Sequence, residues 1–256
     1  MQYDGLDFKI PVESDDYDEC STFVVQQCEA IVKEAIDQGR NRIFINTNLR
    51  ALPMENINKV AGPFVEAWAY ETFVDALNDG KNKYKLENVE AQERLTMSDI
   101  ILQFKMERSV GEGVTAEVDV KATAMDIESS GKSPNITSYG RIRSAYVVDP
   151  DYIFIILSLK HRVLSKRNPE TSMMDGIMEV VAYNAYDLKY LDAKDLNYNP
   201  ALGTGQIQVK DIHYVAIVKR TAWDFCQMLD KKYLASGRKT FEDWLALARK
   251  NEWIKE

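Results

Sequence analysis

The sequence predicts a mixed α+β protein, with a central mixed β-sheet flanked by helices. Two observations predict this class: helical apolar periodicity towards both ends of the chain, and short β-type segments, alternating or continuously apolar, between them. A chain of 256 residues can bury a substantial core within one domain. We therefore expect a single domain over residues 1–256, with a mainly helical N-terminal part (1–80), a part that contains the sheet (81–220) and C-terminal helices (221–256).

The N-terminal part begins with an acidic, irregular arm over residues 1–19. Residues 21–36 are expected to form an amphipathic helix, because their apolar side chains recur at helical spacing and Gly39 follows. Residues 42–45 resemble a short strand. The chain is therefore expected to enter the fold through a helix and one strand.

A second helical region follows in the sequence. The pattern is helical again from Pro53, and Pro63 is expected to start a long helix, because proline is favoured in a first helical turn. Apolar residues within 64–77 are spaced for one buried stripe. Glu66 and Tyr70 lie together off this stripe.

Two strands joined by a glycine-containing turn come next, and the second has an unusual polar face. Residues 99–104 and 116–123 carry the β-branched and alternating residues of strands. Because strand side chains alternate between faces, Glu117, Asp119 and Lys121 share one face of the second strand. Two acids and a lysine side by side are costly to shield from water, so this face calls for a specific partner.

The rest of the chain is expected to contain strands and helices in the following order. The expected elements are a polar loop at 123–133, a helix at 135–147, buried strands at 152–160 and 176–186, and one or two strands within 206–218. Two C-terminal helices are expected to follow Thr221 and Thr240, because each threonine precedes an aspartate by three positions, as in a capping box. The role of the polar segment 187–205 is left open.

Composition excludes some classes of protein. The formal charge of −8, from 32 basic and 40 acidic residues, argues against a protein that coats nucleic acid non-specifically, but it allows a specific enzyme with its basic residues in one cleft. The longest apolar run is too short to span a membrane, and the N-terminus lacks the pattern of a signal peptide. Three widely spaced cysteines indicate free thiols in a reducing compartment, the cytoplasm. With only two histidines, no Cys/His zinc spacing can be built.

An aspartate in the first strand of the hairpin suggests what partner the polar face has. If the two strands fold back on each other, Asp99 comes level with Asp119 and Lys121. A divalent metal would neutralise the acids and give the lysine a role beside it. Two acids, a lysine and a metal together outline a Mg²⁺-dependent site for phosphodiester cleavage. The alternative is an exposed edge strand whose charges pair across the strands with Lys105 or Arg108.

Short motifs alone discriminate poorly in this chain. Asp-x-Lys occurs six times, and the five copies other than 119–121 lie in predicted polar loops or helix ends, where solvated surface is expected. Residues 129–133 imitate the end of a phosphate-binding loop but lack its first glycine. Gly203-Thr204-Gly205 is expected to be a turn, because the third glycine and the βαβ setting of a dinucleotide site are absent.

Four segments of the chain resemble the PD-(D/E)xK nuclease superfamily, and in particular type II restriction endonucleases of the EcoRV and HincII kind. These segments are Ala61-Gly62-Pro63-Phe64, Ser98-Asp99-Ile100-Ile101-Leu102, Asp119-Val120-Lys121 with the later Ser133-Pro134-Asn135-Ile136-Thr137-Ser138-Tyr139, and Gly205-Gln206-Ile207-Gln208-Val209. One departure is that Ser98 stands where the motif has proline. The resemblance implies a PD-(D/E)xK restriction-endonuclease-like fold and favours the metal site over the exposed ladder.

The resemblance also implies roles for the polar cluster. Asp99 and Asp119 would hold Mg²⁺ together with the Val120 carbonyl. Lys121 would orient or deprotonate the attacking water and stabilise charge on the phosphate, and the products would carry 5′-phosphate and 3′-hydroxyl ends. Glu66 would assist a second metal, or else is a solvated helix residue.

DNA recognition is expected to come from the segment after the catalytic strand. Asn135 is the best candidate for a base contact, and Arg141 and Arg143 are expected to hold phosphates. Other DNA-binding candidates around them are Lys132, Ser133, Thr137 and Tyr139. A palindromic double-stranded site read by one small domain implies a homodimer, with residues 1–80 as its dimerisation part.

The sequence leaves three functions open. The first is a Mg²⁺-dependent, sequence-specific DNA endonuclease, that is, a type II restriction enzyme. The second is a repair or recombination nuclease that reads DNA structure rather than sequence. The third is a non-catalytic DNA-binding protein in which the acids are surface charge.

Overall fold

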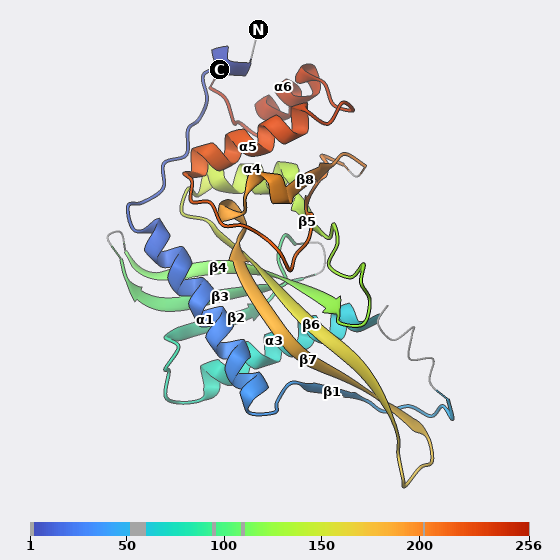
Figure 1. Cartoon of the computed structure of the whole chain (residues 1–256). Coiled ribbons are helices and arrows are strands. Elements are labelled where there is room, and N and C mark those ends of the chain that lie inside the picture. The colour runs from blue at the N-terminus through green and yellow to red at the C-terminus, as the bar shows by residue number, and fades with distance from the viewer. Residues whose placement is uncertain (1–2, 52–59, 94–95, 109–110, 202, 256) are drawn as a thin grey trace.

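The computed structural model describes residues 3–51, 60–93, 96–108, 111–201 and 203–255 (Figure 1). Their strands form one large mixed sheet and one small antiparallel sheet. The large sheet has the order β1 (Arg42–Ile45), β7 (Met174–Asp187), β6 (Ile153–Arg167), β4 (Glu112–Ala124), β3 (Ile100–Glu107) and β2 (Leu86–Ala91). Neighbouring strands are antiparallel except β4 and β6, which run parallel. The predicted mixed α+β class with one central mixed sheet is confirmed.

Two long helices cover one face of the large sheet. Helix α1 (Tyr17–Asp37) buries an apolar stripe that includes Val24, Cys28 and Ile31, spaced one helical turn apart. Helix α3 (Ala61–Asn78) packs against β4 and β2 and contributes to the same hydrophobic core. Both helices match their predictions closely, whereas the helical prediction from Pro53 lies outside the described residues.

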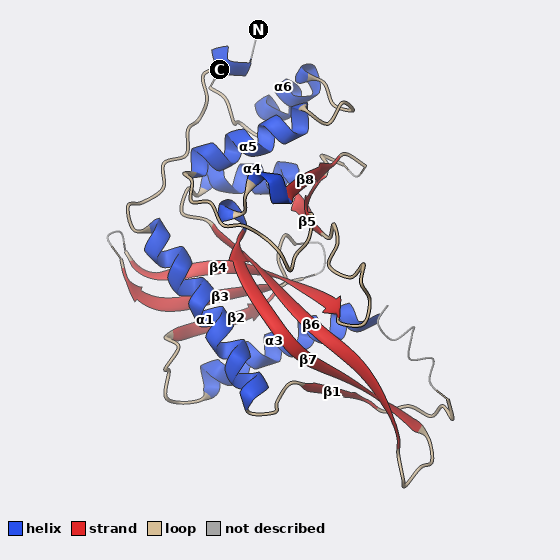
Figure 2. Ribbon diagram, in the orientation of Figure 1, coloured by secondary structure: helices blue, strands red, loops and turns tan. Residues whose placement is uncertain are grey.

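The small sheet and the remaining helices gather at one end of the large sheet, above the start of β6 (Figure 2). The small sheet has the order β5 (Asn135–Ser138), β9 (Gln206–Val209) and β8 (Leu196–Asn199). Helices α4 (Tyr139–Val148), α5 (Ala222–Leu234) and α6 (Phe241–Lys250) pack with it into a second core, to which the large sheet contributes Phe154 and Ile156. Alternate residues of β6 therefore pack into two different cores. Because both faces of the strand are buried, its sequence is apolar without a break.

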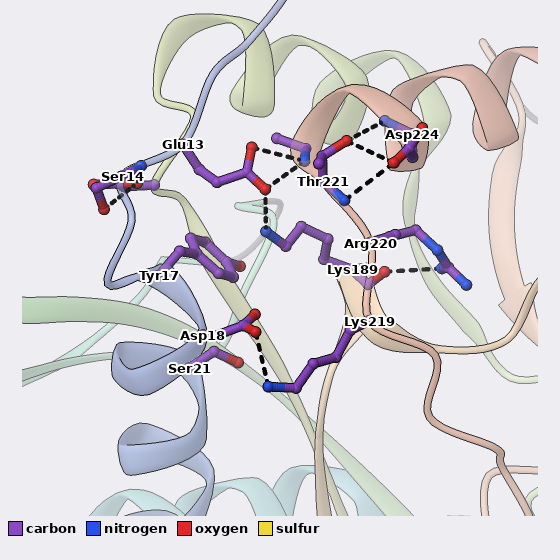
Figure 3. Close-up of polar contacts among 12 residues, drawn as sticks. Glu13, Ser14, Tyr17, Asp18, Ser21, Lys189, Lys219, Arg220, Thr221 and Asp224 are labelled. Atoms are coloured by element: carbon purple, nitrogen blue, oxygen red, sulfur yellow. Dashed lines mark hydrogen bonds and ion pairs between the residues drawn. The ribbon is translucent and has the colours of Figure 1, made fainter.

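The N-terminal arm ties these layers together. It opens with the short 3-10 helix η1 (Tyr3–Gly5), and Phe8 forms a β-bridge with Ile254 near the C-terminus. Figure 3 shows the next contact along the arm, where Glu13 accepts the Ala222 N–H at the start of α5 (2.9 Å) and pairs with the Lys189 ammonium (3.2 Å). Lys189 lies in the 3-10 helix η3 (Leu188–Tyr190), which is followed by η4 (Ala193–Asp195). The arm is therefore a strap from the central sheet to the C-terminal helices.

Both predicted capping boxes are present. Thr221 and Asp224 exchange hydrogen bonds at the start of α5, and Thr240 and Asp243 do so at the start of α6. In each box the threonine hydroxyl accepts an otherwise unpaired N–H of the first turn. The local sequence alone was sufficient to place the first turn of both helices.

The structure differs from the predicted elements in three places. The predicted helix at 135–147 is strand β5 followed by helix α4, because residues 135–138 pair with β9, about 70 positions later in the chain. Strand β2 was not predicted, because it is a charged edge strand whose outer residues are exposed. Strands β6 and β7 extend beyond the predicted 152–160 and 176–186 into a long hairpin with an exposed tip.

The structure also tests the predictions about the cysteines and the solvated aspartates. All three cysteines are buried and none forms a disulfide. Of the Asp-x-Lys aspartates predicted to be solvated, Asp187 and Asp230 are instead buried, at 3% and 0% exposure. Across the helices that the structure describes, none is both long and apolar enough to cross a membrane.

Candidate active site at the start of β3

The register of the β3–β4 hairpin brings Asp99 level with the polar face of β4. Ile100 pairs with Val118, and the Asp99 N–H donates to the Val118 carbonyl at 3.0 Å, so Asp99 lies opposite Asp119. Residues directly opposite in an antiparallel pair point to the same face. The Val120 N–H also donates to Asp99 Oδ2 at 2.7 Å. The Asp99 side chain thus accepts a main-chain hydrogen bond at the point where β3 begins.

Asp119 is buried with incomplete hydrogen bonding. It is 4% exposed, and its Oδ1 accepts from the Lys121 ammonium at 2.6 Å. Its Oδ2 has no hydrogen-bond partner among the described residues. Burial raises the pKa of Asp119 to about 7 against the opposing effect of the Lys121 charge, and the Asp99 and Glu66 carboxylates raise it further. An acid in this condition needs additional positive charge to ionise fully.

Glu66 belongs to the same electrostatic cluster. It lies on α3, which packs against β4. Burial raises the pKa of Glu66, the nearby Asp99 charge raises it further, and Lys121 lowers it. The helix, the start of β3 and the middle of β4 therefore bring three carboxylates and one ammonium within electrostatic reach.

The residues of this cluster fit a hard divalent cation. Asp119 Oδ2 is an acceptor without a donor, and Asp99 has a second carboxylate oxygen besides the one that Val120 holds. The Val120 N–H faces Asp99, and the carbonyl of a strand residue points to the same side as its N–H, so the Val120 carbonyl faces this edge too. No group of three or more His, Cys, Asp or Glu side chains in the described ranges is arranged to hold an ion. Two carboxylates and a main-chain oxygen are consistent with that, because Mg²⁺ keeps several waters and needs few protein ligands.

The predicted DNA-binding residues divide into surface and interior groups. Lys132 and Asn135 are exposed, with Lys132 paired to Asp211 and Asn135 Oδ1 accepting from Gln208 Nε2 at 2.9 Å. Ser133 is exposed and adopts a positive φ of 51°. Arg141 is exposed on α4, whereas Thr137 is buried in β5. The surface members therefore cluster along the segment from the loop after β4 to the start of α4.

Tyr139 and Arg143 are placed differently from the prediction. Both are 0% exposed, and both bind the buried Asp230 of α5. The Arg143 guanidinium also lies over the ring of Trp253, 5.0 Å from its centroid. An arginine held inside a core cannot reach a phosphate, so neither residue belongs to a DNA-contacting surface.

A groove beside the segment that precedes Asp99 contains residues that the sequence did not single out. Two cavities of about 690 and 420 Å³ share Met97, Ser138, Arg141 and Thr204 in their walls. Met97 precedes Asp99 by two residues in the chain, but among the described residues that line these cavities are none of the acidic cluster itself. The groove separates the start of β3 from the small sheet and α4.

Thr204 shapes one wall of this groove. Its hydroxyl lies 2.8 Å from Ser138 Oγ and accepts the Gly140 N–H at 3.2 Å. A Cβ on Gly205 would lie 2.1 Å from the Tyr198 ring, and Gly205 has a φ of +90°, so only glycine fits there. The Gly203-Thr204-Gly205 sequence was correctly expected to be a turn, but its position beside α4 depends on contacts 60 residues apart, which no local signal reveals.

Comparison of sequences with known proteins finds relatives over nearly the whole chain. The sequence profile of the family described as "Type II restriction endonuclease HpaI" matches residues 4–252. The type II restriction enzyme HpaI of Haemophilus parainfluenzae is 56% identical over 257 residues, which cover 100% of both chains. Among solved structures, the NlaIV restriction endonuclease resembles 89% of this chain over 96% of its own length, at 12% identity and a TM-score of 0.39.

Proposed function

The chain belongs to the HpaI family of type II restriction endonucleases, and on that premise we propose that Asp99, Asp119 and Lys121 are the centre at which it hydrolyses DNA. One observation carries this assignment: the buried Asp119 has one oxygen bound to Lys121 and the other without a donor in the described part of the chain, directly across from Asp99. A structural acid would have both oxygens satisfied. The full-length relationship supports a restriction enzyme over a repair nuclease or a non-catalytic DNA-binding protein.

The metal of this centre is proposed to be Mg²⁺. Enzymes of this type generally need a divalent ion, and oxygen ligands from two carboxylates and the Val120 carbonyl suit Mg²⁺ best. When bound, the ion would lower the pKa of a water and neutralise charge on the scissile phosphate. Glu66, whose pKa is raised by burial and by Asp99, is proposed to assist a second ion.

Lys121 has the most direct chemical role among the protein groups. Its ammonium is held at the carboxylate of Asp119, beside the proposed metal site. The ammonium would orient the attacking water and stabilise the negative charge that develops on the phosphate. To deprotonate that water, Lys121 would first have to give up its own proton. In-line attack would leave 5′-phosphate and 3′-hydroxyl ends.

DNA is proposed to lie along the surface that includes Lys132, Ser133, Asn135 and Arg141. Asn135 is exposed, and its carbonyl oxygen is oriented by Gln208, which leaves the amide N–H groups for a base edge. Arg141, in the wall of the groove that Met97 also lines, is proposed to hold a phosphate. Thr137 is buried beneath them in β5 and supports this surface from below.

The enzyme is proposed to act as a homodimer on a palindromic double-stranded site. Residues 1–80 are proposed to include the dimerisation part. Large apolar side chains are exposed in this region, among them Phe44, Leu49, Val60 and Phe64. A contiguous patch of such side chains would favour a protein interface. The buried thiols fit the reducing cytoplasm, where we place the enzyme.

Digestion of plasmid DNA with Mg²⁺ tests the assignment. The wild type should give discrete fragments, whereas Asp119→Asn and Lys121→Met should bind the same DNA but cut it at least about 1000-fold more slowly, because several kcal/mol of transition-state stabilisation is lost. Asp192→Asn and Lys194→Met are matched controls, since they change an ion-paired Asp-x-Lys on the surface. Unchanged cutting by either 119 or 121 variant would remove the site assignment.

A further inference from the structure

The segment that leads into Asp99 is fastened to β4 by a buried side-chain hydrogen bond. Ser98 Oγ donates to Glu117 Oε2 at 2.8 Å, and Ser98 is 5% exposed. Glu117 lies two residues before Asp119 on the same face of β4. The bond therefore connects the residue next to one proposed metal ligand with the residue two positions from the other.

This bond lies where the regular strand pairing ends. The β3–β4 ladder begins at Ile100, and beyond it Asp99 still donates its N–H to Val118 and accepts the Gln92 N–H at 2.8 Å. At the next residue upstream, the described contact between the two strands is the side-chain bond from Ser98 to Glu117. This pair, together with the hydrogen bond from the Thr96 hydroxyl to the Ser98 carbonyl (2.8 Å), thus sets the direction of the chain into Asp99.

The identity of residue 98 makes such a restraint necessary. In the motif that the sequence resembles, proline stands here, and a proline ring fixes φ near −65°. Serine has no such restriction, so the backbone before Asp99 is more adaptable than in a chain with proline. A hydrogen bond to the neighbouring strand restores the restraint by other means.

Glu117 does not have the placement of a metal ligand. Its Oε2 is occupied by Ser98, and its charge raises the pKa of the Tyr152 hydroxyl, after the larger effect of burial, so this carboxylate faces Tyr152. The described acids also include no set of three arranged around one ion. Glu117 is therefore a group that acts through Asp99 rather than one that touches the reacting atoms.

We propose that Ser98 and Glu117 form a positioning pair that fixes the Asp99 carboxylate for ion binding. The inference rests on the proposed function, because it takes Asp99 to be a metal ligand. Groups that orient a ligand in this way typically change metal affinity or activity about 10- to 100-fold when removed. What the pair contributes is the hydrogen bond, and the charge of Glu117 is not required.

The test is Mn²⁺ binding to the full-length protein, followed through the electron paramagnetic resonance signal of free Mn²⁺. Ser98→Ala and Glu117→Ala should each weaken binding about tenfold. Glu117→Gln should bind within about twofold of the wild type, because the amide oxygen still accepts the serine proton. The double variant Ser98→Ala/Glu117→Ala should be no weaker than either single variant, since one bond is lost in all three. The Mg²⁺ concentration needed for half-maximal plasmid cleavage should shift in parallel.

Controls separate this inference from the proposed function. Thr115→Ala removes an exposed hydroxyl from the same face of β4 and should bind Mn²⁺ as the wild type does. The melting temperatures of all variants are compared, so that loss of the fold is not mistaken for loss of the site. If Asp99→Asn and Asp119→Asn lose Mn²⁺ while Ser98→Ala and Glu117→Ala keep it, the positioning pair is overturned alone.

Two other outcomes are also decisive. If Asp99→Asn and Asp119→Asn bind Mn²⁺ normally, the metal site itself is misplaced and the positioning pair is overturned with it. A loss in Glu117→Gln as large as that in Glu117→Ala would mean that the charge of Glu117 acts on the ion directly, which contradicts a role through the hydrogen bond.

Discussion

Asp119 and Asp230 are both buried acids next to a cationic side chain, yet their carboxylate oxygens are hydrogen-bonded to different degrees. Asp230 accepts hydrogen bonds from Tyr139 (2.6 Å) and Tyr3 (2.7 Å), and the Arg143 Nε lies 3.2 and 3.3 Å from its two oxygens. Asp119 accepts from Lys121 only, and its second oxygen lacks a donor in the described structure. Both aspartates stand two residues before a lysine, so the local sequence does not separate them.

The difference teaches that burial and a nearby charge do not by themselves mark a functional acid. Asp187, a third buried example, accepts from Tyr17, Ser21 and the Lys189 N–H, and so resembles Asp230. Buried polar groups are normally satisfied, because an unpaired one costs free energy. Asp119 departs from this rule at a carboxylate oxygen that lies across from a second acid, and this combination supports the proposed cation site.

The largest expected effect comes from removing the satisfied acid. Asp230→Ala leaves the Arg143 guanidinium buried without its counter-charge, which should cost about 3–5 kcal/mol in the free energy of unfolding. Urea denaturation followed by circular dichroism measures the loss. DNA cleavage by the folded fraction, assayed at low temperature, should remain close to wild type. Selective loss of cleavage with normal stability would show that Asp230 is functional and would break the comparison.

The sequence predicted the β3–β4 hairpin well because its signals are local. Alternation placed Asp119 and Lys121 on one face, and the glycine-containing turn required the two strands to meet, which brought Asp99 to their level. The starts of α5 and α6 were predicted from Thr221 and Thr240 for the same reason. In each case the contact that forms the element joins residues close together in the sequence, so the spacing of residue types is enough to predict it.

The parts that could not be predicted depend on contacts distant in the sequence. Arg143 was expected on the DNA, but its position on α4 faces a core formed by α5 and the C-terminal Trp253, about 90 to 110 residues later. Strand β5 was expected to be helical, because its pairing with β9 is equally distant. Neither partner can be identified from spacing within one segment.

A second prediction concerns the pH dependence of the metal-free protein. The pKa of Asp119 is raised to about 7 in the folded protein from its ordinary 3.8, so the folded protein holds this proton more tightly than the unfolded chain does. The resulting stabilisation is complete below pH 3.8 and is lost as the pH rises through about 7. Asp119→Asn does not titrate. In EDTA at pH 8 this variant should therefore be more stable than the wild type by on the order of 2–4 kcal/mol, and the difference should vanish towards pH 4.

Metal addition sharpens this prediction. Saturating Mg²⁺ should stabilise the wild type and leave the variant unchanged, because ligand binding to the folded state shifts its stability by mass action. Glu112→Gln, which removes an exposed carboxylate from the same strand, serves as the control and should follow the wild type at every pH. A wild type whose stability does not change between pH 4 and 8 in EDTA would contradict the description of Asp119 as an incompletely paired acid.

The smallest effect is expected from removing one donor from the satisfied acid. Tyr3→Phe deletes a single hydrogen bond to Asp230 Oδ2 and leaves those from Tyr139 and Arg143 in place. Burial and then the Asp230 charge hold the pKa of Tyr3 well above its usual range, so the hydroxyl is a donor throughout the working pH range. Tyr3 is only partly buried, so water can replace part of the lost bond, and the cost should be about 1 kcal/mol without a change in cleavage. Urea unfolding measures it. If Tyr3→Phe lowered the free energy of unfolding as much as Asp230→Ala does, the N-terminal strap rather than Arg143 would be what stabilises Asp230 in the core. Loss of one donor would then be costly even for a carboxylate whose two oxygens both keep other hydrogen bonds.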